Sequence, residues 1–301
     1  MEASLTRLLT KAIDYAGLFP PAKLEMPAAF SEYVTLREGE HAWIMDRFAC
    51  NVARLSLLSS EIASSSAAPI EITAIGSGGN TIDEWQKNLE ADRAALEKFE
   101  RSVGPKAAVL AYESRIPHCR NVEACLNALN GFAETDLVVE LPWDGDQGDA
   151  LAEIAGHDDF AAKARLGGAD AAAFPSPDLV AEFIANVVQL GLPFKLTAGL
   201  HHPFPIDDPA TGGKMHGFIN VLTAICLALE HDFSRNELME VLQDRDAAEF
   251  RFVSKDIYWK DLRISHDTIE EARDLFIGWG SCSILEPIED MQKFGLMGVN
   301  A

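Results

Sequence analysis

Short apolar runs rich in β-branched residues alternate along the chain with longer segments in which apolar residues recur every three or four positions. The short runs predict buried strands, and the longer segments predict amphipathic helices. This alternation is typical of βαβ units, in which a helix connects two parallel strands. The predicted strands are Tyr15–Phe19, Ala53–Leu58, Ile70–Gly76, Ala107–Glu113, Leu137–Leu141, Phe160–Arg165, Pro193–Ala198 and Glu249–Ser254.

Two of the predicted helices carry clear end signals. Thr81 stands before a long periodic stretch and is a predicted N-cap, because its hydroxyl can accept a hydrogen bond from the first turn. Ser176 is a second predicted N-cap, followed by Pro177 in the first turn and by Gly191 at the end of the helix. These signals place helices between the strands.

Eight parallel strands with intervening helices predict a (β/α)8 barrel of the TIM type, formed as a single domain by residues 1–301. The last connection is long, since 216–230 and 234–244 read as two helices before the eighth strand. The segment 250–265 reads either as that strand or as a hairpin. An open, doubly wound parallel sheet is therefore the alternative fold.

Composition narrows the classes of partner. The 301 residues are 48% hydrophobic, and 25 basic against 47 acidic side chains give a net charge of −22. Such a surface repels nucleic acids and anionic membranes, so we expect neither as a partner. The five cysteines include no C-x-x-C pair, and Arg7 and Lys11 interrupt the apolar residues at the amino terminus. A cytoplasmic protein is expected; the sequence does not indicate an oligomeric state.

Charged residues interrupt three consecutive predicted strands at their carboxyl ends. Glu140 ends one strand, Lys163 and Arg165 end the next, and Lys195 and Thr197 end the third. Residues two apart on a strand share a face, and buried charges need partners or water. Because the carboxyl ends of barrel strands carry the active sites of this fold, the set predicts an active site. The alternative is an ion-pair network that only plugs the barrel.

Two lysines on neighbouring strands indicate amine chemistry. A lysine is nucleophilic only when neutral, and a second cation nearby favours the neutral form. Lys163 is therefore the predicted Schiff-base residue and Lys195 the residue that lowers its pKa. Glu140 and His202 are predicted to carry protons, while Arg165 is predicted to bind the anionic group of a small carbonyl substrate.

The segment 137–199 resembles class I aldolase barrels, deoxyribose-phosphate aldolase in particular. The pieces that carry the resemblance are VVELP, KARLGG and KLTAG, which match a strand ending in glutamate and two lysine-bearing strands. The resemblance implies that Lys163 forms the Schiff base and that Lys195 perturbs it. Arg165 and the LHHP sequence depart from that family. As a whole, the chain resembles an uncharacterised bacterial family with TAGLHHP, MHGF and GSCS-x-x-EP segments, which implies no activity.

Three histidines and a carboxylate form an alternative site. His201 and His202 follow the third charged strand, and His216 stands just before a predicted helix. His202, His216 and Glu140 are the alternative metal ligands, although no H-x-H or H-E-x-x-H spacing supports them. Without a metal, His201 and His216 are predicted to bind substrate.

Small residues complete the candidate set. Gly168 lets a substrate approach the backbone, and Thr197 and Ser281 supply hydroxyl groups to it. The GSGG sequence at 76–79 is either an anion-binding loop or, more simply, a tight turn. Asp14 is either a general acid or base or a capping residue.

Three functions follow from these residues. The leading hypothesis is a cofactor-independent lyase of the aldolase type that acts on a small anionic carbonyl compound. The second is a metal-assisted hydrolase, isomerase or lyase. The third is a non-catalytic barrel that binds a small anion.

Overall fold

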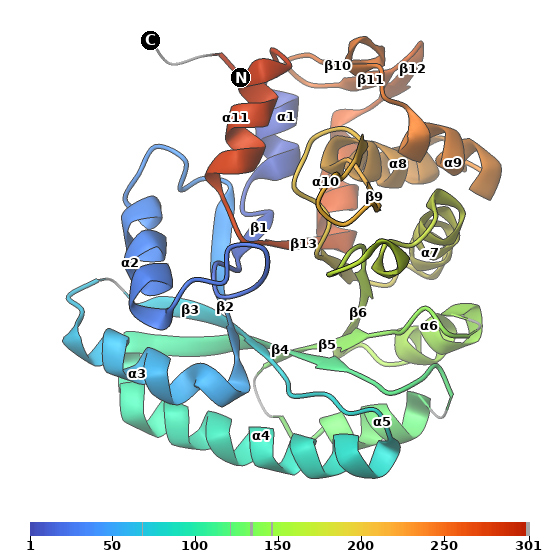
Figure 1. Ribbon diagram of the computed structural model, residues 1–301. Coiled ribbons are helices and arrows are strands. Elements are labelled where there is room, and N and C mark those ends of the chain that lie inside the picture. Colours follow the sequence, from blue (N-terminus) through green and yellow to red (C-terminus); the bar gives the residue numbers. More distant parts are fainter. Residues whose placement is uncertain (68, 121, 133–134, 146, 299–301) are drawn as a thin grey trace.

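The computed structural model describes residues 1–67, 69–120, 122–132, 135–145 and 147–298. Eight parallel strands form a closed barrel, and helices surround it (Figure 1). The predicted (β/α)8 barrel is therefore confirmed, and the open-sheet alternative is wrong. In order around the barrel, the strands are β1 (Ile13–Tyr15), β2 (Met45–Asn51), β3 (Ile70–Ile75), β4 (Ala107–Arg115), β5 (Asp136–Glu140), β6 (Phe160–Arg165), β7 (Phe194–Thr197) and β13 (Phe276–Ser281).

Helices connect the strands, and both predicted N-caps are confirmed. The Thr81 hydroxyl accepts a hydrogen bond from the Glu84 amide at 3.2 Å, and the Ser176 hydroxyl accepts one from the Leu179 amide at 3.3 Å. Gly191 ends its helix in the left-handed conformation at φ 60°. The α-helices are α1 (Ala3–Leu9), α2 (Met26–Arg37), α3 (Leu55–Ser64), α4 (Ile82–Val103), α5 (Val122–Leu129), α6 (Gln147–Ala155), α7 (Pro177–Leu190), α8 (Phe218–His231), α9 (Arg235–Gln243), α10 (His266–Leu275) and α11 (Leu285–Lys293).

The predicted second strand, Ala53–Leu58, is wrong. Its residues form a short 3-10 turn and the first part of α3, and the barrel strand β2 precedes them. Asp46 and Arg47 interrupt the apolar pattern of β2, which is why the pattern did not reveal it. The Arg47 guanidinium contacts Asp136 of β5 at 3.2 Å, so this charge is compensated by another strand of the barrel.

The predicted eighth strand, Glu249–Ser254, is also wrong. The closing strand is β13, which pairs in parallel with both β1 and β7. Glycines at 278 and 280 conceal its strand character. Gly278 is required there, because its φ is 154° and a Cβ atom would lie 2.6 Å from the Ala12 carbonyl oxygen. The predicted first strand overlaps β1 only at Tyr15, whereas the five central predictions are confirmed.

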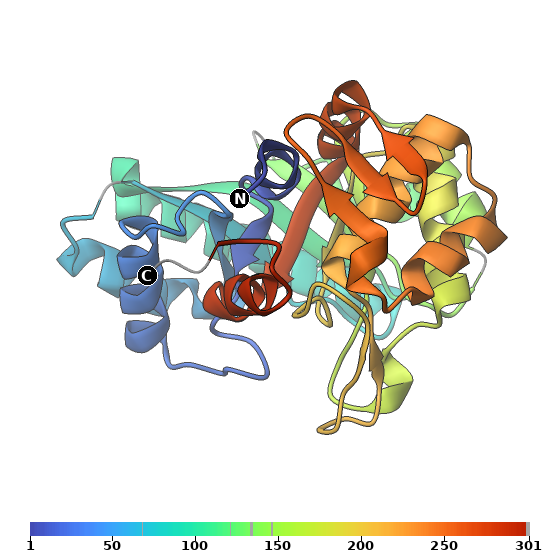
Figure 2. The same ribbon diagram turned by 90° about the horizontal axis from the view of Figure 1, so that it is seen from above.

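The residues between β7 and β13 form a large excursion from the barrel. It begins with a hairpin of β8 (Ile206–Asp207) and β9 (Lys214–Met215), continues through α8 and α9 as predicted, and then forms an antiparallel sheet. That sheet confirms the hairpin alternative for 250–265. Figure 2 shows α8, α9 and this sheet on the side of the barrel opposite α2 and α3. The sheet strands are β10 (Phe250–Phe252), β11 (Ile257–Trp259) and β12 (Leu262–Ile264).

The core lies between the barrel and its helices. Phe194 of β7 contacts Phe183 of α7 with ring centroids 5.6 Å apart, and both side chains are fully buried. Within the described residues, no helix has the length and apolar character needed to cross a membrane.

Candidate active site

Three charged side chains come together where β5, β6 and β7 end. Lys163 pairs in register with Glu140 on one side and with Lys195 on the other. Residues in register on parallel strands project from the same face of the sheet, so the three side chains point the same way. The Lys163 side chain is only 3% exposed. The fold therefore brings together three of the residues that the sequence predicted for the site.

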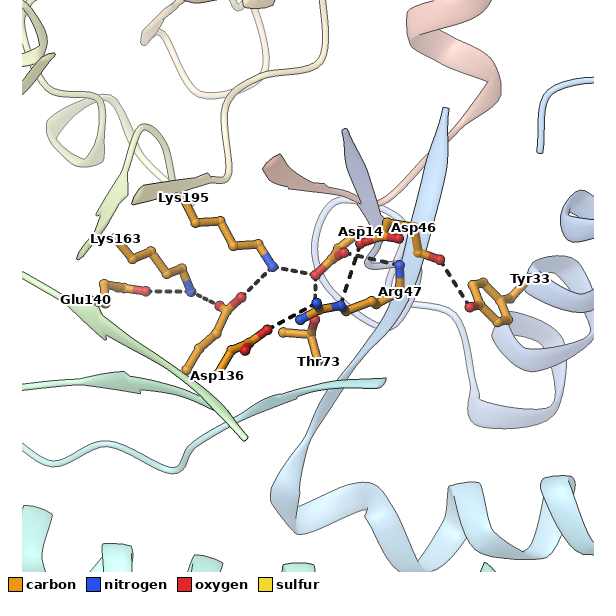
Figure 3. A network of polar contacts seen from close by, with 10 residues as sticks. Asp14, Tyr33, Asp46, Arg47, Thr73, Asp136, Glu140, Lys163 and Lys195 are labelled. Carbon is orange, nitrogen blue, oxygen red and sulfur yellow. Dashed lines mark hydrogen bonds and ion pairs between the residues drawn. The ribbon is translucent and has the colours of Figure 1, made fainter. Parts of the chain in front are cut away.

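A fourth residue, Glu113 of β4, lies between the two lysines. Its carboxylate contacts the Lys163 ammonium through one oxygen and the Lys195 ammonium through the other, the latter at 2.6 Å. Glu140 contacts Lys163 at 2.9 Å, and Asp14 of β1 contacts Lys195. Figure 3 shows this row of alternating charges, from Glu140 through the lysines to Asp14. Each ammonium thus has two carboxylate partners.

Further hydrogen bonds fix the ends of this row. The Thr73 hydroxyl of β3 donates to Asp14 at 2.6 Å, and the Arg47 amide donates to the other oxygen of Asp14 at 3.2 Å. At the opposite end, the Arg165 guanidinium contacts Glu140 at 3.2 Å, and its side chain is 48% exposed. Buried charges are tolerated when they are paired in this way.

The pKa of each buried group follows from its neighbours. Burial alone would raise the pKa of Glu113, but Lys163 and Lys195 outweigh it and lower that pKa to about 2. Burial would also raise the pKa of Glu140, which Lys163 and Arg165 lower. Burial lowers the pKa of a lysine, yet the paired carboxylates raise the pKa of both lysines above the ordinary value. The prediction that Lys195 lowers the pKa of Lys163 is therefore wrong, because Glu113 stands between them.

Two cavities meet at Lys163. The larger, of about 590 Å³, also reaches Asp14 and Lys195, and the smaller, of about 330 Å³, reaches Glu140 and the loop 76–80. The ion-pair network therefore borders both cavities, at Lys163 and Glu113. Of the predicted site residues, those that line the larger cavity are Lys163, Arg165, Gly168, Lys195, Thr197, His201 and His202.

The two adjacent histidines are each held by α11. The Nδ1 atom of His201 lies 3.0 Å from a carboxylate oxygen of Glu286, and the Nδ1 atom of His202 contacts Asp290. The His201 contact lowers the pKa of Glu286. A histidine whose Nδ1 is fixed by a carboxylate keeps a defined ring orientation and tautomer. Both rings are therefore positioned at the larger cavity rather than left free.

Two predicted substrate-binding residues are engaged elsewhere. His216 is buried, its Nε2 atom lies 2.9 Å from the Pro175 carbonyl oxygen, and burial lowers its pKa. The Ser281 hydroxyl is buried and donates to the Ser283 carbonyl at 2.7 Å. Within the described residues that line the larger cavity, their neighbours Met215 and Cys282 take their places. Neither side chain is among the residues that line the larger cavity, so their role in substrate binding stays a prediction.

The alternative metal ligands are not brought together. Glu140 contacts Lys163 and Arg165, His202 contacts Asp290, and His216 contacts a backbone carbonyl. Across the described part of the chain, no three or more histidine, cysteine, aspartate or glutamate side chains are arranged to hold a metal ion. The metal hypothesis therefore lacks the ligand geometry that it requires.

Two acidic residues of the site were missed or undervalued in the sequence. Glu113 lies near the carboxyl end of the apolar strand AAVLAYESR, as Glu140 lies at the end of its own strand, so the same pattern could have identified it. Asp14 was named as an acid or base, but nothing in the sequence linked it to Lys195, which lies 181 positions away. Closure of the barrel is what brings them into contact.

Comparison with known proteins adds no assignment: no model of a protein family matches this chain, and no curated protein matches it. The resemblance of 137–199 to class I aldolases therefore stays a prediction from the sequence, as does the resemblance of the whole chain to a bacterial family. A (β/α)8 barrel is compatible with an enzyme but does not select a reaction. The functional argument has to come from the side chains at the mouth.

Proposed function

We propose that this protein is a lyase of the aldolase type that acts on a small anionic carbonyl compound through a Schiff base on Lys163. The observation that carries the proposal is the position of the Lys163 ammonium, which is buried between Glu113 and Glu140 yet borders both cavities. A purely structural lysine gains nothing from facing two cavities. A reactive amine needs both its partners and space for a substrate.

The raised pKa of Lys163 does not oppose a Schiff base at equilibrium. An ammonium ion and a carbonyl group combine to give a protonated imine and one water molecule, and the positive charge is the same before and after. Glu113 and Glu140, which contact the ammonium, therefore stabilise the iminium in the same manner. The cost is kinetic, since the amine must lose a proton before it attacks.

Glu113 is the proposed acceptor of that proton, and its lowered pKa makes the transfer an uphill step. Glu113 contacts Lys163 directly, so proton transfer converts a buried ion pair into a neutral amine and a neutral acid. Lys195 then keeps its contact with Asp14 and its positive charge. Once Glu113 is neutral, that charge is no longer screened from Lys163 and favours the neutral amine.

Carbon–carbon cleavage uses the iminium as an electron sink. A base removes the proton of a hydroxyl group on the β carbon, the bond between the α and β carbons breaks, and the carbonyl fragment leaves. The electron pair forms an enamine on Lys163, which is protonated at carbon and hydrolysed by water to release the second fragment. Glu140, 2.9 Å from Lys163, and His202 at the larger cavity are the proposed proton carriers.

Trapping with borohydride tests the proposal. The full chain is incubated with small aldehydes and keto acids, reduced, and weighed by intact mass spectrometry. We expect one adduct per chain in the wild type and in Lys87→Arg, which changes an exposed lysine on α4. Lys163→Arg retains the positive charge but cannot form the imine, so its adduct should disappear. Equal trapping in Lys163→Arg, or none in the wild type, overturns the proposed function; binding of anions without trapping would indicate a non-catalytic barrel.

A further inference from the structure

The smaller cavity is bordered by an arginine with no partner. Arg115 ends β4, pairs in register with Glu140, and projects where the strand leaves the barrel. Within the residues that the structure describes, its guanidinium has no ion-pair or hydrogen-bond partner, although it lines the cavity. Arg165 lines the same cavity and is half-exposed. Two guanidinium groups therefore face one small space beside Lys163.

Glu140 fixes how close this space is to the reacting amine. One oxygen of its carboxylate contacts Lys163 at 2.9 Å, and the other contacts Arg165 at 3.2 Å. Only the Glu140 carboxylate therefore separates the Arg165 guanidinium from the Lys163 ammonium. A negative group bound by the arginines would lie on the carbon next to the carbonyl that Lys163 attacks, or very near it.

The charged side chains at the mouth favour a ligand whose anionic group carries one negative charge. Asp14, Glu113 and Glu140 balance the two lysines and Arg165 in number, and Arg115 adds one cation that has no ion-pair partner within the described residues. Glu84 also lines the smaller cavity, where its carboxylate accepts a hydrogen bond from the Asn80 amide at 2.9 Å. The glycine loop adds little, because the amide and hydroxyl of Ser77 both donate to Asp92 at 2.7 Å. One free guanidinium matches a carboxylate better than a phosphate dianion.

The larger cavity has an apolar part in its lining that the smaller cavity lacks. This part includes the side chains of Pro21, Phe174 and Met215. The hairpin of β8 and β9 contributes Met215 and lies against Phe174, since a Cβ atom on Gly213 would meet that ring at 2.3 Å. The smaller cavity thus offers an anion-binding wall and the larger cavity an apolar wall, and both cavities border Lys163.

We infer that the substrate is a 4-hydroxy-2-oxo acid with an apolar substituent on the carbon that bears the hydroxyl. This inference rests on the proposed function. Arg115 and Arg165 hold the carboxylate in the smaller cavity, Lys163 attacks the adjacent carbonyl, and the apolar substituent occupies the larger cavity. Cleavage between C3 and C4 transfers the hydroxyl proton to a base, releases the apolar aldehyde and leaves the enamine of pyruvate. Protonation at C3 and addition of water then release pyruvate.

Two matched probes test the anionic subsite. Pyruvate carries the carboxylate, and pyruvamide replaces it with a neutral amide of similar size. In borohydride trapping of the full chain, we expect half-maximal labelling at a lower concentration of pyruvate than of pyruvamide. In Arg115→Gln, the pyruvate concentration that gives half-maximal labelling should rise by roughly tenfold. The corresponding concentration of pyruvamide should not change. Arg165→Gln provides a second variant, and Arg101→Gln, on the exposed face of α4, is the control.

Calorimetric titration with lactate separates the two proposals. Lactate has the carboxylate but no carbonyl, so its dissociation constant reports the subsite without any Schiff base. Weaker lactate binding in Arg115→Gln together with absent trapping would retain the subsite and overturn the lyase. Equal labelling by both probes, unaffected by either arginine variant, would overturn the subsite and leave the lyase in place. Inorganic phosphate binding more tightly than lactate would overturn the assignment of a carboxylate.

Discussion

The two ends of the barrel both carry charged side chains, but they use them differently. At the amino-terminal end, Arg47 of β2 reaches across to Asp136, the first residue of β5, whose side chain is 67% exposed. At the carboxyl-terminal end, Glu113 is 2% exposed and contacts two equally buried lysines. Figure 3 shows the two groups within one view. The Arg47 side chain is 18% exposed, so only its partner is well exposed, and a pair of this kind contributes about 0–1 kcal/mol.

Burial of the charged side chains at the carboxyl-terminal end has a high cost in folding free energy. Removing charges from water carries a penalty that ion pairing offsets only when the geometry is good, and an apolar plug of similar volume would be as stable or more so. The mouth nevertheless holds three carboxylates and two lysines against two cavities. Under the proposed function, this difference means that the charges at the mouth serve chemistry rather than stability.

The largest expected effect is on reactivity. Lys163→Ala should lower turnover, or the rate of adduct formation with a keto acid, by roughly 10⁴-fold, as loss of a covalent nucleophile does. Arg47→Ala, at the other end of the barrel, should leave that rate nearly unchanged. Rates from single-turnover trapping, with circular dichroism as a check on folding, compare the two variants. A similar loss of trapping rate in Lys163→Ala and Arg47→Ala would contradict the proposed difference between the two ends of the barrel.

The next effect is on stability. Glu113→Gln removes one charged partner from Lys163 and one from Lys195. Because both ammonium groups are buried, we expect the free energy of unfolding to fall by about 3–5 kcal/mol. Asp136→Asn removes the exposed partner of Arg47 and should cost no more than about 1 kcal/mol. Urea titration monitored by tryptophan fluorescence measures both. A Glu113 variant as stable as the Asp136 variant would contradict the electrostatic account of the mouth.

The sequence predicted the basic half of this site better than the acidic half. Lys163, Arg165 and Lys195 stand out because cations interrupt apolar strands, and their register was implied by their order along the chain. Asp14 was ambiguous because β1 is only three residues long and offers no periodicity. Glu113 stands two residues before the end of its strand, and the sequence does not indicate that it contacts both lysines. Nor does the sequence indicate that the Ser281 hydroxyl donates to the backbone carbonyl of Ser283.

The fold was predicted where local pattern and barrel position agree. The five central strands are apolar and are followed by amphipathic helices, so periodicity alone locates them. Strand β2 was missed because Asp46 and Arg47 interrupt its apolar pattern, and the partner of Arg47, Asp136, lies on a distant strand. Strand β13 was missed because close packing on Ala12 requires glycine at 278. Both failures arise from contacts made by residues far apart in the sequence, which no local pattern contains.

A third prediction concerns pH. Folding lowers the pKa of Glu113 from its ordinary value of 4.5 to about 2, so its contribution to stability is fully present above about pH 4.5 and is lost as the pH falls toward 2. The difference in unfolding free energy between the wild type and Glu113→Gln should therefore shrink across that window. Urea titrations at several pH values measure it. A difference that stays constant down to pH 2 would show that Glu113 acts through packing rather than charge.

The smallest effect is the response to salt. Asp136→Asn should cost a few tenths of a kcal/mol less at 1 M sodium chloride than at low salt, because exposed pairs are screened. The cost of Glu113→Gln should change less, since its partners are buried. Parallel denaturation curves at both salt concentrations check this. Equal salt dependence at both positions would remove the contrast between the barrel ends.

The most direct test of the central claim is to map the residue that a reduced carbonyl adduct modifies. Wild-type protein is treated with pyruvate and borohydride and then digested, and the labelled peptides are sequenced by mass spectrometry. The account predicts that the label is confined to Lys163 and that Lys195 is unmodified. Label on Lys195 alone would reverse the roles of the two lysines, and label spread over exposed lysines such as Lys87 would contradict a reactive site at the mouth of the barrel.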